Sequence, residues 1–80
     1  MNKLQTDQAQ FERLKLKLAI NKYLFKWGKD YAVQVHNKNP WASDELFNSV
    51  VEEMAAEKML LKETGRNGGL ILVYHRMEAA

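Results

Sequence analysis

The chain of 80 residues contains no cysteine, which excludes disulfide bridges and a zinc site built on thiolates. The absence of cysteine is typical of proteins that work in a reducing compartment. The first residues, MNKLQTDQAQF, lack the apolar core of a signal peptide, and no hydrophobic run approaches the length that crosses a membrane. We therefore expect a cytoplasmic protein.

Groups that carry catalysis or hold metal ions are also scarce. The two histidines, His36 and His75, are far apart, and neither has acids at metal-ligand spacing beside it. The glycine-rich GRNGG at residues 65–69 is not a phosphate-binding loop, because the lysine and the helix that follow such a loop are missing. We expect no enzyme activity, no catalytic residues, no metal site and no cofactor.

The composition favours one compact domain. Hydrophobic residues make up 46% of the chain and aromatic residues 10%, which is enough for a core and argues against disorder. Neither an internal repeat nor a low-complexity segment interrupts the sequence. We expect a single domain over residues 1–80, with frayed ends at residues 1–6 and 77–80.

Charge is distributed unevenly along the chain, although the net charge is only +2. Residues 1–29 contain seven Lys or Arg and two acids, whereas residues 30–64 contain three and seven. Because electrostatic fields act locally, a partner meets a basic first third and an acidic middle rather than the average.

The first predicted element is a helix from Thr6 or Asp7 to Trp27. Lys26 in its last turn and Gly28 just beyond it are ordinary helix stop signals. A helical wheel gives two apolar stripes on roughly opposite sides, with Lys15, Lys22 and Lys26 between them. The first stripe contains Leu16, Ile20, Tyr23, Leu24 and Trp27, and the second contains Phe11, Leu14, Leu18 and Phe25.

Two stripes on one helix have two explanations. The helix is either covered on both sides by its own domain, or one stripe packs the core while the other pairs with a second copy. Since 80 residues leave little chain to cover both sides, we favour a homodimer with Phe11, Leu14, Leu18 and Phe25 in its interface.

The middle of the chain contains one ambiguous segment and one clear helix. Residues 31–37 are either a short helix capped by Asp30 or a strand, and Asn39-Pro40 ends this segment. Trp41, beside the proline, is expected to anchor the start of the next helix, with a surface contact as the alternative. That helix runs from Ser43 as N-cap to about residue 58, with one apolar stripe formed by Leu46, Phe47, Val50, Val51 and Met54.

The end of the chain predicts an antiparallel hairpin of residues 60–63 and 70–75. The turn between them contains Gly65, Gly68 and Gly69, and we expect all three to supply the positive φ angles that such a loop needs.

The order of these elements, and above all the stretch SDELFNSVVEEMAAEKMLLKETGRNGGLILVYH at residues 43–75, resembles a winged helix-turn-helix domain. The resemblance implies an α+β fold with two or three helices and a C-terminal β-hairpin wing in a sheet of two or three strands. The second helix departs from the family pattern because it is barely long enough. If residues 31–35 form a strand, the order becomes α-β-α-β-β.

In this family the third helix usually enters the DNA major groove, and the wing lies along the backbone or the minor groove. Asn48 and Ser49 would then read bases, since asparagine pairs with adenine through two hydrogen bonds. The remaining residues that this resemblance places on double-stranded DNA are Ser43, Lys38, Lys62, Arg66 and Asn67.

The predicted function is that of a small dimeric DNA-binding protein, a transcription regulator or a replication accessory factor of plasmid or phage type. Against DNA stand five acids on the third helix, at positions 44, 45, 52, 53 and 57, because placing them near phosphate costs energy. The alternative is therefore a protein-interaction module or inhibitor that uses the acidic helix at residues 43–58 and the second stripe of the first helix, without DNA.

Overall fold

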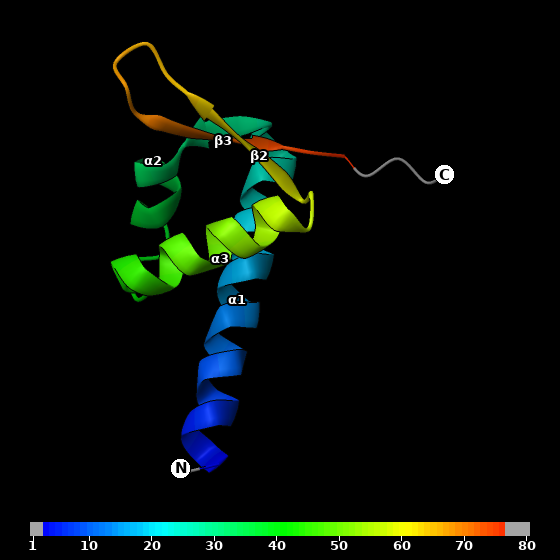
Figure 1. The fold of residues 1–80 in the computed structure, drawn as a ribbon, viewed down its shortest axis with the longest axis vertical. Helices are drawn as coiled ribbons and strands as arrows, with labels where there is room; N and C mark the ends of the chain where they lie inside the picture. The colour runs from blue at the N-terminus through cyan, green and yellow to red at the C-terminus, as the bar shows by residue number, and fades with distance from the viewer. Residues whose placement is uncertain (1–2, 77–80) are drawn as a thin grey trace.

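The computed structural model describes residues 3–76, with side chains from residue 7 onward. The chain forms three helices and three strands (Figure 1). They are α1 (Lys3–Trp27), β1 (Lys29–Tyr31), α2 (Ala32–Asn37), α3 (Asp44–Ala56), β2 (Leu60–Thr64) and β3 (Leu70–Tyr74).

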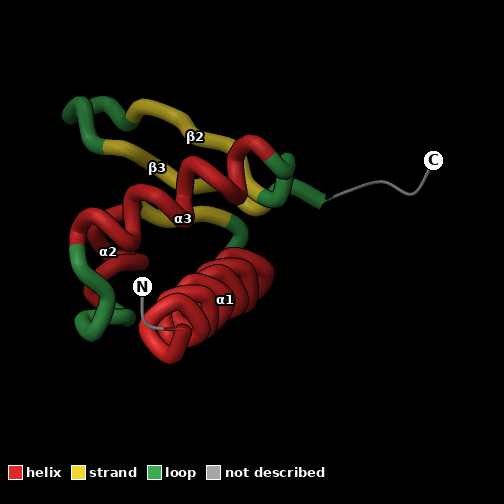
Figure 2. The backbone as a smooth tube through the Cα atoms, turned by 60° about the horizontal axis from the view of Figure 1, so that its bottom comes forward, coloured by secondary structure: helices red, strands yellow, loops and turns green. Residues whose placement is uncertain are grey.

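The strands form one antiparallel sheet in the order β1-β3-β2. Strand β3 is central, with Leu72 opposite Lys62 on one side and opposite Asp30 on the other. Helix α1 packs against both α3 and strands β1 and β3, and α3 packs against β2 (Figure 2). The arrangement confirms the predicted α+β class with a C-terminal hairpin, and it is compatible with a winged helix.

The ambiguous segment contains both of the predicted elements in succession. Residues 29–31 pair with β3, and the helix begins directly after them at Ala32. Asp30 is not the N-cap of α2, because its carboxylate accepts hydrogen bonds from the Tyr23 hydroxyl (2.5 Å) and the Tyr31 amide (2.7 Å). Tyr31 occupies the N-cap position with no side-chain cap. The helix ends where the buried Asn39 side chain donates to the Val35 carbonyl at 3.1 Å.

Helix α1 ends where the sequence predicts. Gly28 adopts a positive φ of 85°, and its amide donates to the Leu24 carbonyl at 2.7 Å, which is a common way for a helix to stop at glycine. The helix begins at Lys3, before the predicted start at Thr6 or Asp7. Its N-terminal half extends beyond the rest of the domain (Figure 1). Residues 1–2 and 77–80, which we expected to fray, lie outside the described chain.

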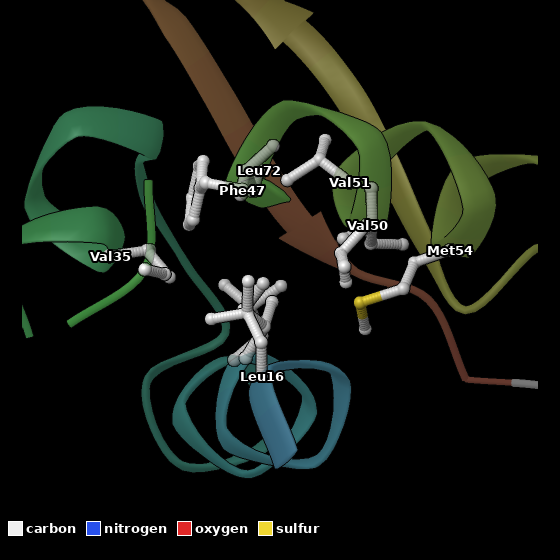
Figure 3. Packing of buried hydrophobic residues seen from close by; sticks show 11 residues of the cluster. Leu16, Val35, Phe47, Val50, Val51, Met54 and Leu72 are labelled. Carbon is white, nitrogen blue, oxygen red and sulfur yellow. The ribbon is translucent and has the colours of Figure 1, made fainter. Parts of the chain in front are cut away.

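The core lies where α1, α3 and the sheet meet. Leu16 of α1 lies opposite side chains of α2, α3 and β3 (Figure 3). Burying such a side chain stabilises the fold by about 1.5–3 kcal/mol. The buried hydrophobic residues are Leu16, Ile20, Leu24, Val35, Ala42, Phe47, Val50, Val51, Met54, Leu60 and Leu72.

Two tryptophans are more exposed than predicted. Trp27 belongs to the first stripe of α1 but is 61% exposed, because the buried part of that stripe ends at Leu24. A helical wheel gives the direction of a side chain, not whether another element lies opposite it. Trp41 is 41% exposed, and the Lys15 ammonium lies 4.6 Å from its ring centre.

Candidate nucleic-acid interface

The wing is the turn at residues 65–69 between β2 and β3. The Gly65 amide donates to the Gly69 carbonyl at 2.7 Å, and the Gly68 amide donates to the Gly65 carbonyl at 2.9 Å. The Asn67 side-chain oxygen accepts from the Gly69 amide at 3.0 Å. These bonds hold the turn in one shape and leave Arg66 exposed near its tip.

The glycines of the wing have two different roles. Gly68 has a positive φ of 84°, but the described backbone shows no positive φ at Gly65 or Gly69, so the prediction for these two was wrong. Glycine is needed at these two positions because the Tyr31 ring lies against the backbone there. A Cβ atom on Gly65 would meet that ring at 3.0 Å, and one on Gly69 would meet it at 3.2 Å. Tyr31 of β1 therefore supports the base of the wing.

Helix α3 begins as the sequence predicts. Ser43 has an extended backbone, and its hydroxyl accepts a hydrogen bond from the Leu46 amide at 3.1 Å, which makes it a standard N-cap. Its first turn contains Asp44 and Glu45. The N-terminal end of α3 and the tip of the wing lie on the same side of the molecule, the left in Figure 1, with the wing above α3.

The two predicted base readers have different surroundings. Asn48 is exposed, and the hydrogen bonds found in the described part of the chain leave its side chain free. The Ser49 hydroxyl instead accepts a hydrogen bond from the Arg13 guanidinium at 2.8 Å, which directs it toward α1. Of the two, Asn48 is better placed to meet an external partner.

Basic side chains from α1 and β2 form ion pairs with Glu52 and Glu53 of α3 and with Glu57, the C-cap residue of this helix. Glu53 accepts from Arg13 at 3.1 Å and from Lys17 at 3.3 Å, and Lys17 also pairs with Glu57. The Arg13 guanidinium, with help from Lys17, holds the pKa of Glu53 below its ordinary value, and the hydrogen bond to Glu57 raises the pKa of Lys17. On the sheet side, Lys62 pairs with Glu52 at 2.5 Å.

The predicted DNA-binding lysines therefore lie in different places. Lys62 of β2 lies beside α3 through its pair with Glu52. Lys38, just after α2, lines a separate hollow with Lys22 and Lys26 of α1. The wing, Asn48 and Lys62 make up the candidate interface, and Lys38 belongs to another surface.

Sequence reasoning missed Arg13 and Lys17 as partners of α3, and Tyr31 as the support of the wing. A signal for the first was present. Arg13 and Lys17 are four residues apart, as are Ser49, Glu53 and Glu57, so both sets follow one line along a helix. No comparable spacing connects Tyr31 with Gly65 and Gly69.

The second stripe of α1 is exposed in the single chain. Phe11, Leu14, Leu18 and Phe25 are between 55% and 71% exposed, so the domain does not cover both sides of this helix. Phe25 makes an edge contact with the Tyr74 ring, with 5.5 Å between ring centres. An exposed apolar stripe of this kind is typical of an interaction surface.

Among residues 3–76, no helix is long and apolar enough to cross a membrane. The same part of the chain contains no group of three or more His, Cys, Asp or Glu residues that could hold a metal ion. Comparison of the sequence and the structure with protein-family models, curated proteins and solved structures finds no match.

Proposed function

We propose that the chain is a small winged-helix protein that binds double-stranded DNA through its wing and the exposed part of α3. The observation that carries this proposal is the neutralisation of Glu52, Glu53 and Glu57 by basic side chains of the same chain. The acids of α3 were the main argument against DNA. With three of them in ion pairs, their repulsion of phosphate is reduced.

Arg66 and Asn48 would make the direct contacts. The exposed guanidinium of Arg66 suits a phosphate or a narrow minor groove, and the free amide of Asn48 can pair with adenine. Lys62 would stay paired with Glu52 and so lower the repulsion between this acid and a nearby phosphate. The wing residue Asn67 would add its amide nitrogen, since its oxygen already holds the Gly69 amide.

A homodimer paired through α1 is the second part of the proposal. The exposed stripe lies on a helix whose N-terminal half extends beyond the domain (Figure 1). An antiparallel pair with Leu14 of one copy against Leu18 of the other would cover the exposed stripe in both copies.

A dimer would double the contacts with DNA and suit a palindromic or repeated site. The biological role that fits is regulation of transcription, or assistance in replication of a plasmid or phage. The protein-interaction alternative rests on the acidic helix at residues 43–58 and on the second stripe of α1. The ion pairs of Glu52, Glu53 and Glu57 leave Asp44 and Glu45 without a partner from α1 or β2, which favours DNA over the first part of this alternative. The exposed stripe fits a protein partner as well as a second copy of the chain.

The test is a titration of fluorescent duplex DNA, followed by anisotropy at low and near-physiological salt. We expect binding that weakens steeply with salt, because phosphate contacts release counterions. Arg66→Ala should lower the affinity at least about tenfold, the value of a hydrogen bond to a charged group. Arg76→Ala is the matched control, since Arg76 is exposed after β3, away from the turn. Equal affinity in the Arg66 variant and the parent would contradict the assignment of the wing.

A further inference from the structure

A second basic surface lies on the other side of α1 from α3. A hollow of about 350 Å³ opens between the C-terminal half of α1 and the end of α2. The residues that line it are Ala19, Lys22, Tyr23, Lys26, Trp27 and Lys38. None of the three lysines forms an ion pair with another residue of the described chain, in contrast to Arg13, Lys17 and Lys62.

Apart from Asp30, the segments that build this hollow contain no acid. Residues 13–29 contain six Lys or Arg and no Asp or Glu, and residues 31–43 contain one lysine and no acid. Asp30, between these segments, is held by the Tyr23 hydroxyl and the Tyr31 amide. Glu12, the nearest acid on α1, is about 15 Å from Lys22 along the helix axis at about 1.5 Å per residue. The hollow is therefore a place where negative charge is favoured.

The wall of the hollow is aromatic. The Trp27 indole is largely exposed, the Lys26 ammonium lies 5.2 Å from its ring centre, and the Tyr23 ring lies 6.4 Å from it. Lys15 is on the same side of α1, within about 40° of Lys22 and Lys26 at about 100° per residue, and its ammonium lies over the Trp41 ring. Lysines and exposed indoles thus follow one another on this surface.

We propose that this hollow binds single-stranded nucleic acid, with an unpaired base stacked on Trp27 and its flanking phosphates held by Lys22, Lys26 and Lys38. Aromatic stacking combined with a track of positive charge is how proteins hold single strands without reading their sequence. A duplex offers the same phosphates but keeps its bases stacked, so the indole gains nothing from it. The Lys15–Trp41 pair would hold the next part of the strand.

This site is independent of the wing, which allows the two to be tested separately. A fluorescent oligo-dT of about a dozen nucleotides, within the usual site size of about 4–16, is titrated with the protein. Trp27→Ala should weaken binding by roughly fivefold to a hundredfold, the usual effect of losing one stacked base. Trp27→Phe, which keeps a ring, should restore part of the affinity. Because Trp27 is exposed, these variants should keep the parent's circular dichroism and melting temperature.

Three controls separate the possible outcomes. Arg66→Ala should bind oligo-dT as the parent does, while Trp27→Ala should keep any affinity for duplex DNA. Oligo-U in parallel distinguishes RNA from DNA as the natural strand, since both offer bases and phosphates. Inorganic polyphosphate should compete weakly with oligo-dT, and its own binding should be the same in the parent and in Trp27→Ala. If Trp27→Ala binds oligo-dT like the parent, or if polyphosphate competes as well as oligo-dT does, the stacking site is wrong.

Discussion

The basic residues on one side of α1 form ion pairs within the described chain, and those on the other side do not. Arg13 and Lys17 face α3 and form ion pairs with its acids, whereas Lys22 and Lys26 face the end of α2 and remain free beside Trp27. The charges are alike, and the helix is the same. The difference lies in the element opposite, which has acids in one case and none in the other. The apolar stripes of α1 divide in the same way: the first is covered by α3 and the sheet as far as Leu24, and the second is exposed.

The two stripes should differ most in their effect on stability. Leu16→Ala removes a fully buried side chain from the core and should lower the free energy of unfolding by about 2–5 kcal/mol. Leu18 lies two residues after Leu16 but on the exposed stripe. Leu18→Ala should therefore change the stability of the monomer little and should weaken self-association. Chemical denaturation and sedimentation at several protein concentrations measure the two effects. A Leu18 variant that associates like the parent would contradict the dimer.

The wing can be displaced without touching the hollow at Lys22 and Lys26. Gly65→Ala places a methyl group 3.0 Å from the Tyr31 ring, and overpacking of this kind typically costs about 1–3 kcal/mol. We expect a lower melting temperature and a lower affinity for duplex DNA, with unchanged affinity for oligo-dT. Asn67→Ala, which loses one hydrogen bond but adds no atoms, should be milder. Loss of both affinities together would mean that the two surfaces are not separate.

The two acids at the start of α3, which have no Lys or Arg partner in the described chain, should limit the affinity for duplex DNA. Replacing Asp44 and Glu45 together by Asn and Gln removes two negative charges near the proposed interface and should strengthen duplex binding several-fold at low salt, with less effect at high salt. Glu63→Gln is the control, because it removes one negative charge at an exposed position of β2. If the double variant binds duplex more weakly, the start of α3 does not face the phosphates.

The smallest effect should come from the ion pairs between α1 and α3. Because Arg13 and Lys17 hold the pKa of Glu53 below its ordinary value of 4.5, the ionised carboxylate stabilises the folded state above that pH. This contribution is lost as the pH falls below 4.5 and through the lowered pKa. Glu53→Gln should thus be less stable than the parent at neutral pH, with the difference shrinking in acid. Thermal unfolding from neutral pH to pH 3 tests this, and a difference that grows in acid would contradict it.

Local sequence signals were sufficient for much of the fold. Ser43 as N-cap, Gly28 as helix end and the single stripe of α3 are properties of neighbouring residues, and the structure has all three. Asp30 was predicted to cap the helix that follows it, but its carboxylate accepts a hydrogen bond from Tyr23 of α1. Local sequence does not reveal a bond between a strand and a different helix. The exposure of Trp27 and the contact of Tyr31 with the wing depend on what lies opposite in three dimensions. Hydrophobic spacing along one element contains no information about that.

The contact of Tyr31 with Gly65 and Gly69 has a geometric consequence. Tyr23 of α1 holds Asp30, and the next residue, Tyr31, supports the base of the wing, so the wing keeps a set orientation to α1. In a dimer paired through α1, the separation of the two wings would then be a property of the protein rather than of its target. If about five base pairs, half a helical turn, are inserted between the two halves of a binding site, the second half turns to the opposite face of the DNA. The dimer would then contact only one half.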